Sequence, residues 1–185
     1  MTTIIGLSGS LRSGSFNTAL ARAAAGLMPE GAQLLVKTIH GIPLYDGDVE
    51  ASTGIPATVI ELGEAIAKAD GLLLVTPEYN NSIPGAFKNT IDWLSRIEEG
   101  PRPIFTGKPV ALTGASPGPF GTLLSQTAWL QVLRTLETRP WFGGRLLVSR
   151  AAAMFNSSGE LTDEGIRKKL QEFLAGFVAF VQSQD

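Results

Sequence analysis

The sequence contains no cysteine and one histidine, His40, among its 185 residues. Without thiols, disulfide bonds, thiolate catalysis and cysteine-held metals are excluded. A single imidazole also argues against a histidine-based metal centre or a histidine-dependent catalytic triad. We therefore expect no metal site, and any enzymatic activity needs another source of chemistry.

Long hydrophobic runs are missing as well. No apolar stretch approaches the ~20 residues that span a bilayer, and the start "MTTIIGLSGSLR" lacks the basic start and long apolar core of a secretory signal. Fifteen Lys and Arg against 17 Asp and Glu leave a formal net charge of -2. With no long basic run, nucleic acid and anionic membranes are poor candidates as partners. We expect a cytoplasmic protein without a membrane span.

Hydrophobic residues make up 44% of the chain, which is enough for a sizeable core, and the length suits one domain over residues 1–185. Continuous apolar runs predict buried strands, and residues such as Phe16, Leu20 and Ala24 recur at helical spacing between them. The breaker-rich stretch 40–55 is interpreted as a loop, and the last helix is expected from about Thr162. The five predicted strands cover residues 3–8, 32–39, 70–76, 108–114 and 145–149.

Apolar strands that alternate with helices predict a parallel sheet covered on both faces. With right-handed crossovers, the expected fold class is α/β, a doubly wound five-stranded sheet in the flavodoxin-like order 2-1-3-4-5. Such sheets bind ligands beyond the carboxyl ends of their strands, where the winding reverses. The loops after the first, third and fourth strands meet there, and they carry the most unusual chemistry of this chain.

The first of these loops, "GSLRSGSFN" (residues 9–17), resembles an anion site. The following helix directs free N–H groups and a partial positive charge at it, so a terminal phosphate would find several charge-assisted hydrogen bonds. Helix capping by serine or asparagine is the simpler alternative. The donors are the hydroxyl, amide and guanidinium groups of Ser10, Arg12, Ser13, Ser15, Asn17 and Thr18.

Known glycine motifs do not fit this loop. A Walker phosphate loop requires lysine after Gly14, where Ser15 stands, and a dinucleotide G-x-G-x-x-G pattern is absent. A nucleophile elbow needs glycine where Ser10 stands. The loop "TGASPGPFG" (residues 113–121) nearly imitates the dinucleotide pattern, but it follows the fourth strand. Its glycines allow close approach to a flat ligand, or they form an ordinary turn.

The loop after the third strand, "PEYNNSIP" (residues 77–84), combines two prolines with polar and aromatic groups. Pro84 suits the first turn of the next helix. Amide and hydroxyl donors beside an aromatic face match an isoalloxazine ring, whose electronics a protein tunes by hydrogen bonding. A solvated proline-rich loop is the alternative. Together with a phosphate loop at the same edge, FMN is the better explanation.

These segments resemble the flavodoxin-like NADPH-dependent FMN reductase family, which includes bacterial quinone, chromate and azo-dye reductases. "GSLRSGSFN" is similar to the family's G-S-x-R-x-x-S-x-N loop, and "PEYNNSIPGAFKNTIDW" (residues 77–93) to its P-E-Y-N-x-S-x-P-G-x-L-K-N-x-x-D-W segment. "ASPGPFG", Leu133–Arg134 and "FNSSGELTDE" fit later segments. Phe87 replaces the usual leucine, and Thr122 replaces a common glycine and is expected to alter the space near the ring.

The resemblance implies a set of FMN-binding residues. Phosphate contacts fall on Ser10, Arg12, Ser15, Asn17 and Thr18, with Phe16 in the same loop. The border of the ring falls on Pro77, Glu78, Tyr79, Asn80, Ser82 and Ile83. The other side of the ring falls on Ser116, Gly118 and Gly121. Members of the family form homodimers or homotetramers, so we expect one of these states.

The resemblance also implies a ping-pong two-electron reductase that needs no catalytic side chain, because the cofactor carries the chemistry. NADPH or NADH donates hydride, and a small-molecule acceptor such as a quinone, chromate, an azo compound or free flavin is then reduced. One alternative is a flavodoxin-like electron carrier without NAD(P)H oxidation, although such carriers are strongly acidic. Another is an enzyme that uses free FMN as a substrate.

Overall fold

The computed structural model describes residues 1–97 and 104–183. Its strands are β1 (Thr2–Ser8), β2 (Ala32–Thr38), β3 (Gly71–Val75), β4 (Pro109–Ala115), β5 (Arg139–Pro140) and β6 (Leu146–Val148). Its α-helices are α1 (Phe16–Ala25), α2 (Gly47–Thr53), α3 (Ala57–Lys68), α4 (Gly85–Leu94), α5 (Leu123–Thr135) and α6 (Glu164–Gln182), with a 3-10 turn, η1, at Ala151–Ala153. None of the helices in the described ranges is both long and apolar enough to cross a membrane.

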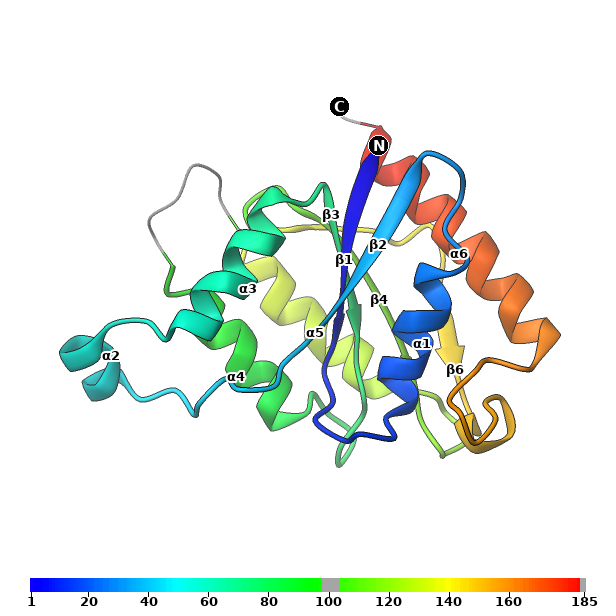
Figure 1. The fold of residues 1–185 in the computed structure, drawn as a ribbon, viewed down its shortest axis with the longest axis horizontal. Helices are drawn as coiled ribbons and strands as arrows, with labels where there is room; N and C mark the ends of the chain where they lie inside the picture. The colour runs from blue at the N-terminus through cyan, green and yellow to red at the C-terminus, as the bar shows by residue number, and fades with distance from the viewer. Residues whose placement is uncertain (98–103, 184–185) are drawn as a thin grey trace.

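The strands form one parallel sheet in the order β2-β1-β3-β4-β5, with β6 also paired to β4 (Figure 1). Ile4 lies opposite Leu34 in β2 and Gly71 in β3, so β1 sits at the centre of the winding. The predicted strand order is confirmed. The predicted strand ends agree to within one or two residues, because continuous aliphatic runs mark strands that are buried on both faces.

Two apolar cores lie on opposite faces of the sheet, as Figure 1 shows from the placing of α1 and α6 on one side and of α3, α4 and α5 on the other. The first core contains Leu20 of α1 and Phe177 of α6, both fully buried. The second contains Phe87 and Trp93 of α4 and Trp129 of α5. The doubly wound arrangement leaves the strand ends free of helix cover, and the chemistry-bearing loops emerge there.

The fifth strand differs from expectation because it comes in two pieces. β5 pairs with Pro109 and Val110 at the start of β4, whereas β6 pairs with Thr113–Ala115 at its end. Between the pieces, Trp141 leaves the sheet and packs its ring against Phe173 and Phe177 of α6, at centroid distances of 5.0 and 5.7 Å. The sequence analysis found β6 and missed β5, since two residues give no periodic signal.

Helix α2 is also absent from the sequence analysis, which interpreted residues 40–55 as a loop. Asp46 caps it by accepting a hydrogen bond from the N–H of Asp48 at 2.9 Å. No residue of α2 is buried, so it carries no apolar stripe that would predict a helix. Glu50 anchors it through a salt bridge of 3.0 Å to Arg96 and a hydrogen bond of 2.9 Å from the Tyr45 hydroxyl.

Candidate functional site

Three loops gather at the carboxyl edge of the sheet. Ser8, Val75 and Thr113 lie in register across β1, β3 and β4. Hydrogen bonds continue the ladder one residue further: the N–H of Gly9 donates to Val75 O at 3.0 Å, and that of Thr76 donates to Thr113 O at 2.8 Å. The predicted ligand loops after β1, β3 and β4 therefore start side by side, at the edge where Figure 1 shows them emerging together.

The first loop ends in a helix cap. The Ser15 side chain accepts hydrogen bonds from the N–H groups of Asn17 and Thr18, at 3.2 Å each. The Thr18 hydroxyl also meets the Ser8 hydroxyl at 2.8 Å in a buried contact. Ser15 therefore caps helix α1, as the simpler alternative proposed. Capping accounts for only this one of the side chains that the sequence analysis named in the loop.

The remaining groups of the first loop fit an anion. Ser10 is 3% exposed, and its hydroxyl accepts a hydrogen bond from the N–H of Arg12 at 3.3 Å. Over residues 1–97 and 104–183, the Arg12 guanidinium has no hydrogen bond or ion pair, and the backbone N–H groups of Ser13 and Gly14 have no acceptor. Open N–H groups, a free cation and a helix N-terminus match a phosphate group.

Asn17 has a second role that its sequence position did not reveal. Its side-chain nitrogen donates to Ala115 O at 2.9 Å, and its side-chain oxygen accepts from the N–H of Ala115 at 2.9 Å. The residue is 5% exposed. This bidentate clamp joins the first turn of α1 to the end of β4, so the first and third loops hold a fixed relative position.

The second loop is a tight hairpin. Tyr79 and Ser82 exchange backbone hydrogen bonds of 3.2 and 3.0 Å. Asn80 and Asn81 between them have φ angles of 50° and 63°, which is the pattern of a type I′ turn. Asparagine tolerates this left-handed region better than most residues. The turn leaves Tyr79 50% exposed, while Pro77 at the base of the loop is buried.

Glu78 ties the second loop to α5. Its carboxylate accepts hydrogen bonds from the N–H groups of Leu124 and Ser125, at 2.8 and 3.0 Å. Thr122 makes no side-chain capping bond, so Glu78 supplies the cap from 46 residues away and places a negative charge at the positive end of the helix dipole. The sequence analysis placed Glu78 beside the ring and did not foresee this bond.

A buried polar network lies beneath that contact. The Thr76 hydroxyl meets the Ser125 hydroxyl at 2.9 Å and accepts a hydrogen bond from the Trp129 indole N–H at 3.0 Å. All three residues are fully buried. Since buried polar groups are stable when they are paired, the network fixes α5 against the end of β3. The only sequence signal for it is a threonine directly before Pro77.

The third loop is pinned at both ends. The Ser116 hydroxyl donates to Gly121 O, and the N–H of Arg150 donates to Gly118 O at 3.0 Å. Gly121 has a φ of 64°, and a side-chain carbon there would lie 3.0 Å from Leu147, so this turn requires glycine. At Gly118 the space is open, because an added carbon would meet only Ser116 Oγ, at 3.9 Å.

Three residues named from the sequence take part in packing. Phe16 is half-buried, with its ring 5.8 Å from that of Phe155. Ile83 is half-buried against the core under α4. Thr122 is fully buried and accepts a hydrogen bond from Gln126 at 3.0 Å; its effect on the space near the ring stays a prediction.

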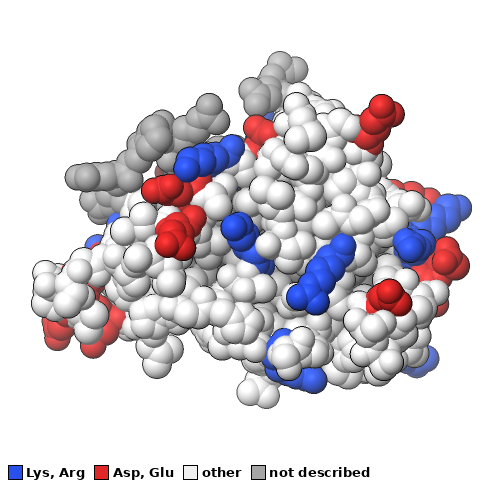
Figure 2. Space-filling model, viewed as in Figure 1, with Lys and Arg blue, Asp and Glu red and all other residues white. Residues whose placement is uncertain are grey.

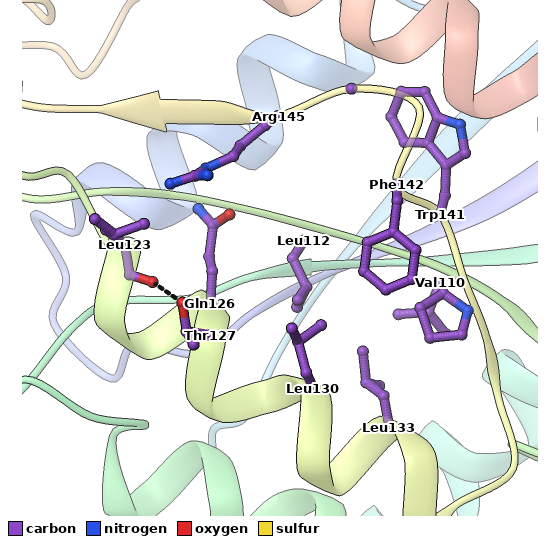
Figure 3. A pocket seen from close by; sticks show the side chains of 12 residues that line it. Val110, Leu112, Leu123, Gln126, Thr127, Leu130, Leu133, Trp141, Phe142 and Arg145 are labelled. Atoms are coloured by element: carbon purple, nitrogen blue, oxygen red, sulfur yellow. Dashed lines mark hydrogen bonds between the residues drawn. The ribbon is translucent and has the colours of Figure 1, made fainter.

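A groove of about 280 Å³ lies apart from these loops, between α5 and the broken edge strand. Figure 3 shows Leu112, Leu130 and Phe142 along its apolar part, while Gln126 and Arg145 add polar groups. On the face seen in Figure 2, acidic and basic side chains are scattered in small groups among uncharged residues. Within the described ranges no three side chains of metal-ligating type cluster together.

The sheet order, with three loops at its carboxyl edge, defines a flavodoxin-like α/β protein. Residues 2–153 match the model of a family described as NADPH-dependent FMN reductase, and the chain belongs to this family. The resemblance noted from the motifs is thereby confirmed. The protein is an NAD(P)H-dependent FMN oxidoreductase.

Relatives match along nearly the whole chain. The NAD(P)H-dependent FMN reductase PA1204 of Pseudomonas aeruginosa is 43% identical over 179 residues, which is 97% of this chain and 95% of the relative. A quinone reductase of Escherichia coli K12 is 39% identical over 184 residues, with the same coverages. The solved structure of FerB, a flavoenzyme NAD(P)H:(acceptor) oxidoreductase from Paracoccus denitrificans, has a TM-score of 0.85 at 32% identity and covers 98% of both chains.

Proposed function

We propose that this protein holds FMN at the three-loop edge and reduces quinones with NAD(P)H in a ping-pong cycle. When bound, FMN accepts hydride from the nicotinamide and passes two electrons to the acceptor. The observation that carries the proposal is the set of donors in the first loop that have no partner among residues 1–97 and 104–183, namely the Arg12 guanidinium and the N–H groups of Ser13 and Gly14.

The first loop would bind the phosphate of FMN. Arg12 supplies the positive charge, and charge-assisted hydrogen bonds of this type contribute ~1.5–3 kcal/mol each. Ser10 offers a hydroxyl at the start of the loop. Because Ser15, Asn17 and Thr18 are already committed to the helix cap, to Ala115 and to Ser8, their part in phosphate binding is mainly to shape the loop.

The second and third loops would border the ring. The residues proposed here are Pro77, Glu78, Tyr79, Asn80, Ser82, Ile83, Ser116, Gly118 and Gly121. The open space at Gly118 admits a flat group close to the backbone. With its carboxylate occupied by α5, Glu78 can offer its backbone N–H to the carbonyl edge of the ring. No side chain has to act as a nucleophile or general base.

The protein's own contribution is alignment. Holding donor and acceptor in turn at one face of a fixed ring supplies up to ~7–11 kcal/mol of the barrier through orientation alone. Each turnover would take one hydride, which carries two electrons and one proton, from one nicotinamide; one further proton from solvent completes the reduction of one quinone to the hydroquinone. Relatives at 39% and 36% identity are named quinone reductase and 2-hydroxy-1,4-benzoquinone reductase, which supports quinones as the acceptor class.

The test is an anaerobic visible absorption titration of the purified protein. We expect a flavin spectrum that bleaches with NADPH or NADH and returns with a quinone; chromate, an azo dye and free flavin are the further acceptors to compare. A flavin spectrum that neither nicotinamide changes would favour an electron carrier. Flavin lost during purification, with free FMN consumed as substrate, would favour a flavin-releasing reductase. Failure to take up FMN would overturn the proposal.

A homodimer or homotetramer in the cytoplasm is part of this proposal. Apolar residues of α5 lie on more than one of its faces: Trp129 and Leu133 are buried in the chain, whereas Leu124 is 43% exposed and Leu130 lines the groove with Phe142. Apolar surface on a second face of a helix gains when another element, here a second copy of the chain, removes it from water. Light scattering of wild type and Phe142→Glu tests this, since a monomeric wild type would contradict it.

A further inference from the structure

An aromatic side chain outside the set named above stands at the edge formed by the three loops. Phe120 lies in the third loop and is 69% exposed. Tyr79 in the second loop is 50% exposed. Neither ring contacts another aromatic ring in the described part of the chain. Covering such a ring with a planar ligand removes apolar surface from water, which is favourable.

The exposure of Phe120 does not come from a loose loop. On its N-terminal side, Gly118 O accepts a hydrogen bond from the N–H of Arg150. On its C-terminal side, Gly121 O accepts one from Ser116 and the backbone packs against Leu147. Both flanks of Phe120 are therefore fixed, and its side chain stays largely uncovered by residues 1–97 and 104–183.

The loops that carry the two rings are fixed to one another. Glu78, directly before Tyr79, accepts hydrogen bonds from Leu124 and Ser125, which follow Phe120 by four and five residues. The Asn17 clamp on Ala115 anchors the start of the same loop. The two aromatic side chains thus belong to one rigid edge, which is what a site for a planar molecule requires, since aromatic contacts depend on fixed ring geometry.

We propose that Phe120 forms a wall of the acceptor site and selects planar aromatic acceptors over small inorganic ones. This inference rests on the proposed function, because it assumes that the acceptor is reduced at the three-loop edge. A quinone ring packs against the Phe120 ring in an offset or edge-to-face arrangement. An inorganic oxidant presents no apolar face and gains nothing from this contact. Phe120 acts on affinity for the acceptor and takes no part in electron or proton transfer.

The test compares steady-state kinetics of the FMN-loaded wild type, Phe120→Leu and Phe120→Tyr with 1,4-naphthoquinone and with ferricyanide. Phe120→Leu should raise the KM for naphthoquinone about three- to tenfold, in line with the loss of one aromatic pair, with a smaller change in kcat. Phe120→Tyr should restore the wild-type KM. The KM for ferricyanide and the Kd for FMN should not change in either variant.

Leu35→Ala is the control, because Leu35 is 44% exposed and lies in β2, outside the three loops and outside the groove beside α5; it should leave both KM values unchanged. An unchanged naphthoquinone KM in Phe120→Leu would overturn this inference alone. Equal rises for both acceptors, or weaker FMN binding, would overturn it too, because Phe120 would then act on the loop or on the cofactor. A wild type that oxidises NADPH without reducing naphthoquinone would overturn the quinone proposal itself.

Discussion

The side-chain amide of Asn17 holds the backbone of Ala115 through two hydrogen bonds of 2.9 Å, across a separation of 98 residues. A clamp of this kind is made entirely by the chain itself. Asn17 can therefore act on FMN binding in two ways. It can contact the ligand directly, or it can hold the loop in the shape that binds the ligand.

Asn17→Asp tests the shaping role with an isosteric change. The new carboxylate loses the donor to Ala115 O and faces that carbonyl oxygen, so the free energy of unfolding of the FMN-free protein should fall by about 1–3 kcal/mol. Urea unfolding without FMN measures it. If stability is unchanged while FMN binds more weakly, Asn17 acts only as a ligand contact and the clamp has no energetic weight.

Arg12→Ala tests phosphate recognition. The guanidinium has no partner in the described part of the chain, so the apoprotein should keep its stability while the Kd for FMN rises about 10- to 100-fold, the equivalent of one charge-assisted bond. Fluorescence titration measures the Kd. Riboflavin, which lacks the phosphate, is the matched ligand and its affinity should not change. An equal loss for both ligands would argue against Arg12 as the phosphate cation.

Glu78→Ala removes the cap of α5. The N–H groups of Leu124 and Ser125 then lack this acceptor. The free energy of unfolding, measured by thermal unfolding, should therefore fall by about 0.5–2 kcal/mol. Glu78→Gln keeps an acceptor oxygen without the charge and should lose less. Both variants should also bind FMN more weakly, because the second loop loses its tether. A Glu78→Ala protein as stable as wild type would show that the cap contributes nothing.

The attachment of α2 should depend on pH. The hydrogen bond from Arg96, and after it the one from Tyr45, lowers the pKa of the Glu50 carboxyl below its ordinary value. The stabilisation that ionised Glu50 gives to the attachment of α2 is fully present above about pH 4.3. It is lost as the pH falls through the lowered pKa. The hydrogen bond that Tyr45 donates to Glu50 raises the pKa of the Tyr45 hydroxyl. The stabilisation from this bond is fully present below about pH 10 and is lost as the pH rises through the raised pKa.

Hydrogen exchange of the α2 amides, corrected for the intrinsic pH dependence, should therefore show most protection between these limits. Glu50→Gln should flatten the acid side of the profile, because the variant has no carboxylate to protonate. The surface pair Lys68–Glu64, at 3.1 Å, offers a control in Glu64→Gln, which should leave α2 unaffected. A pH-independent profile in the wild type would contradict the prediction.

The sheet could be predicted from the sequence because its strands bury both faces and so appear as unbroken aliphatic runs, such as Leu72–Leu74. Helix α2 could not, since none of its residues is buried and its salt bridge from Glu50 to Arg96 joins residues 46 apart. Strand β5 is too short for any periodicity. The hydrophobic pattern of a segment shows only which of its own residues are buried. Helix α2 and strand β5 form because of contacts with residues that are distant in the sequence.

For the candidate site, the sequence predicted which loops bind FMN, because serine, arginine, glycine and proline concentrate in them, and the structure brings the starts of these loops together. It did not identify which side chains serve the protein itself. Ser15 caps its own helix, which a motif predicts, but Asn17 and Glu78 bind backbone from distant elements. Those partners become visible only when the chain is folded. The role of these residues toward FMN stays a prediction.

The break between β5 and β6 also affects how this chain can meet other chains. A long, regular border strand exposes a row of unused backbone groups that a neighbouring polypeptide can extend into a larger sheet. Here that border consists of two short strands, β5 with two residues and β6 with three. They are separated where Trp141 turns away toward α6. Strand addition on this side is therefore disfavoured, which leaves side-chain packing, and so the surfaces of helices, as the means by which copies of this protein can associate there.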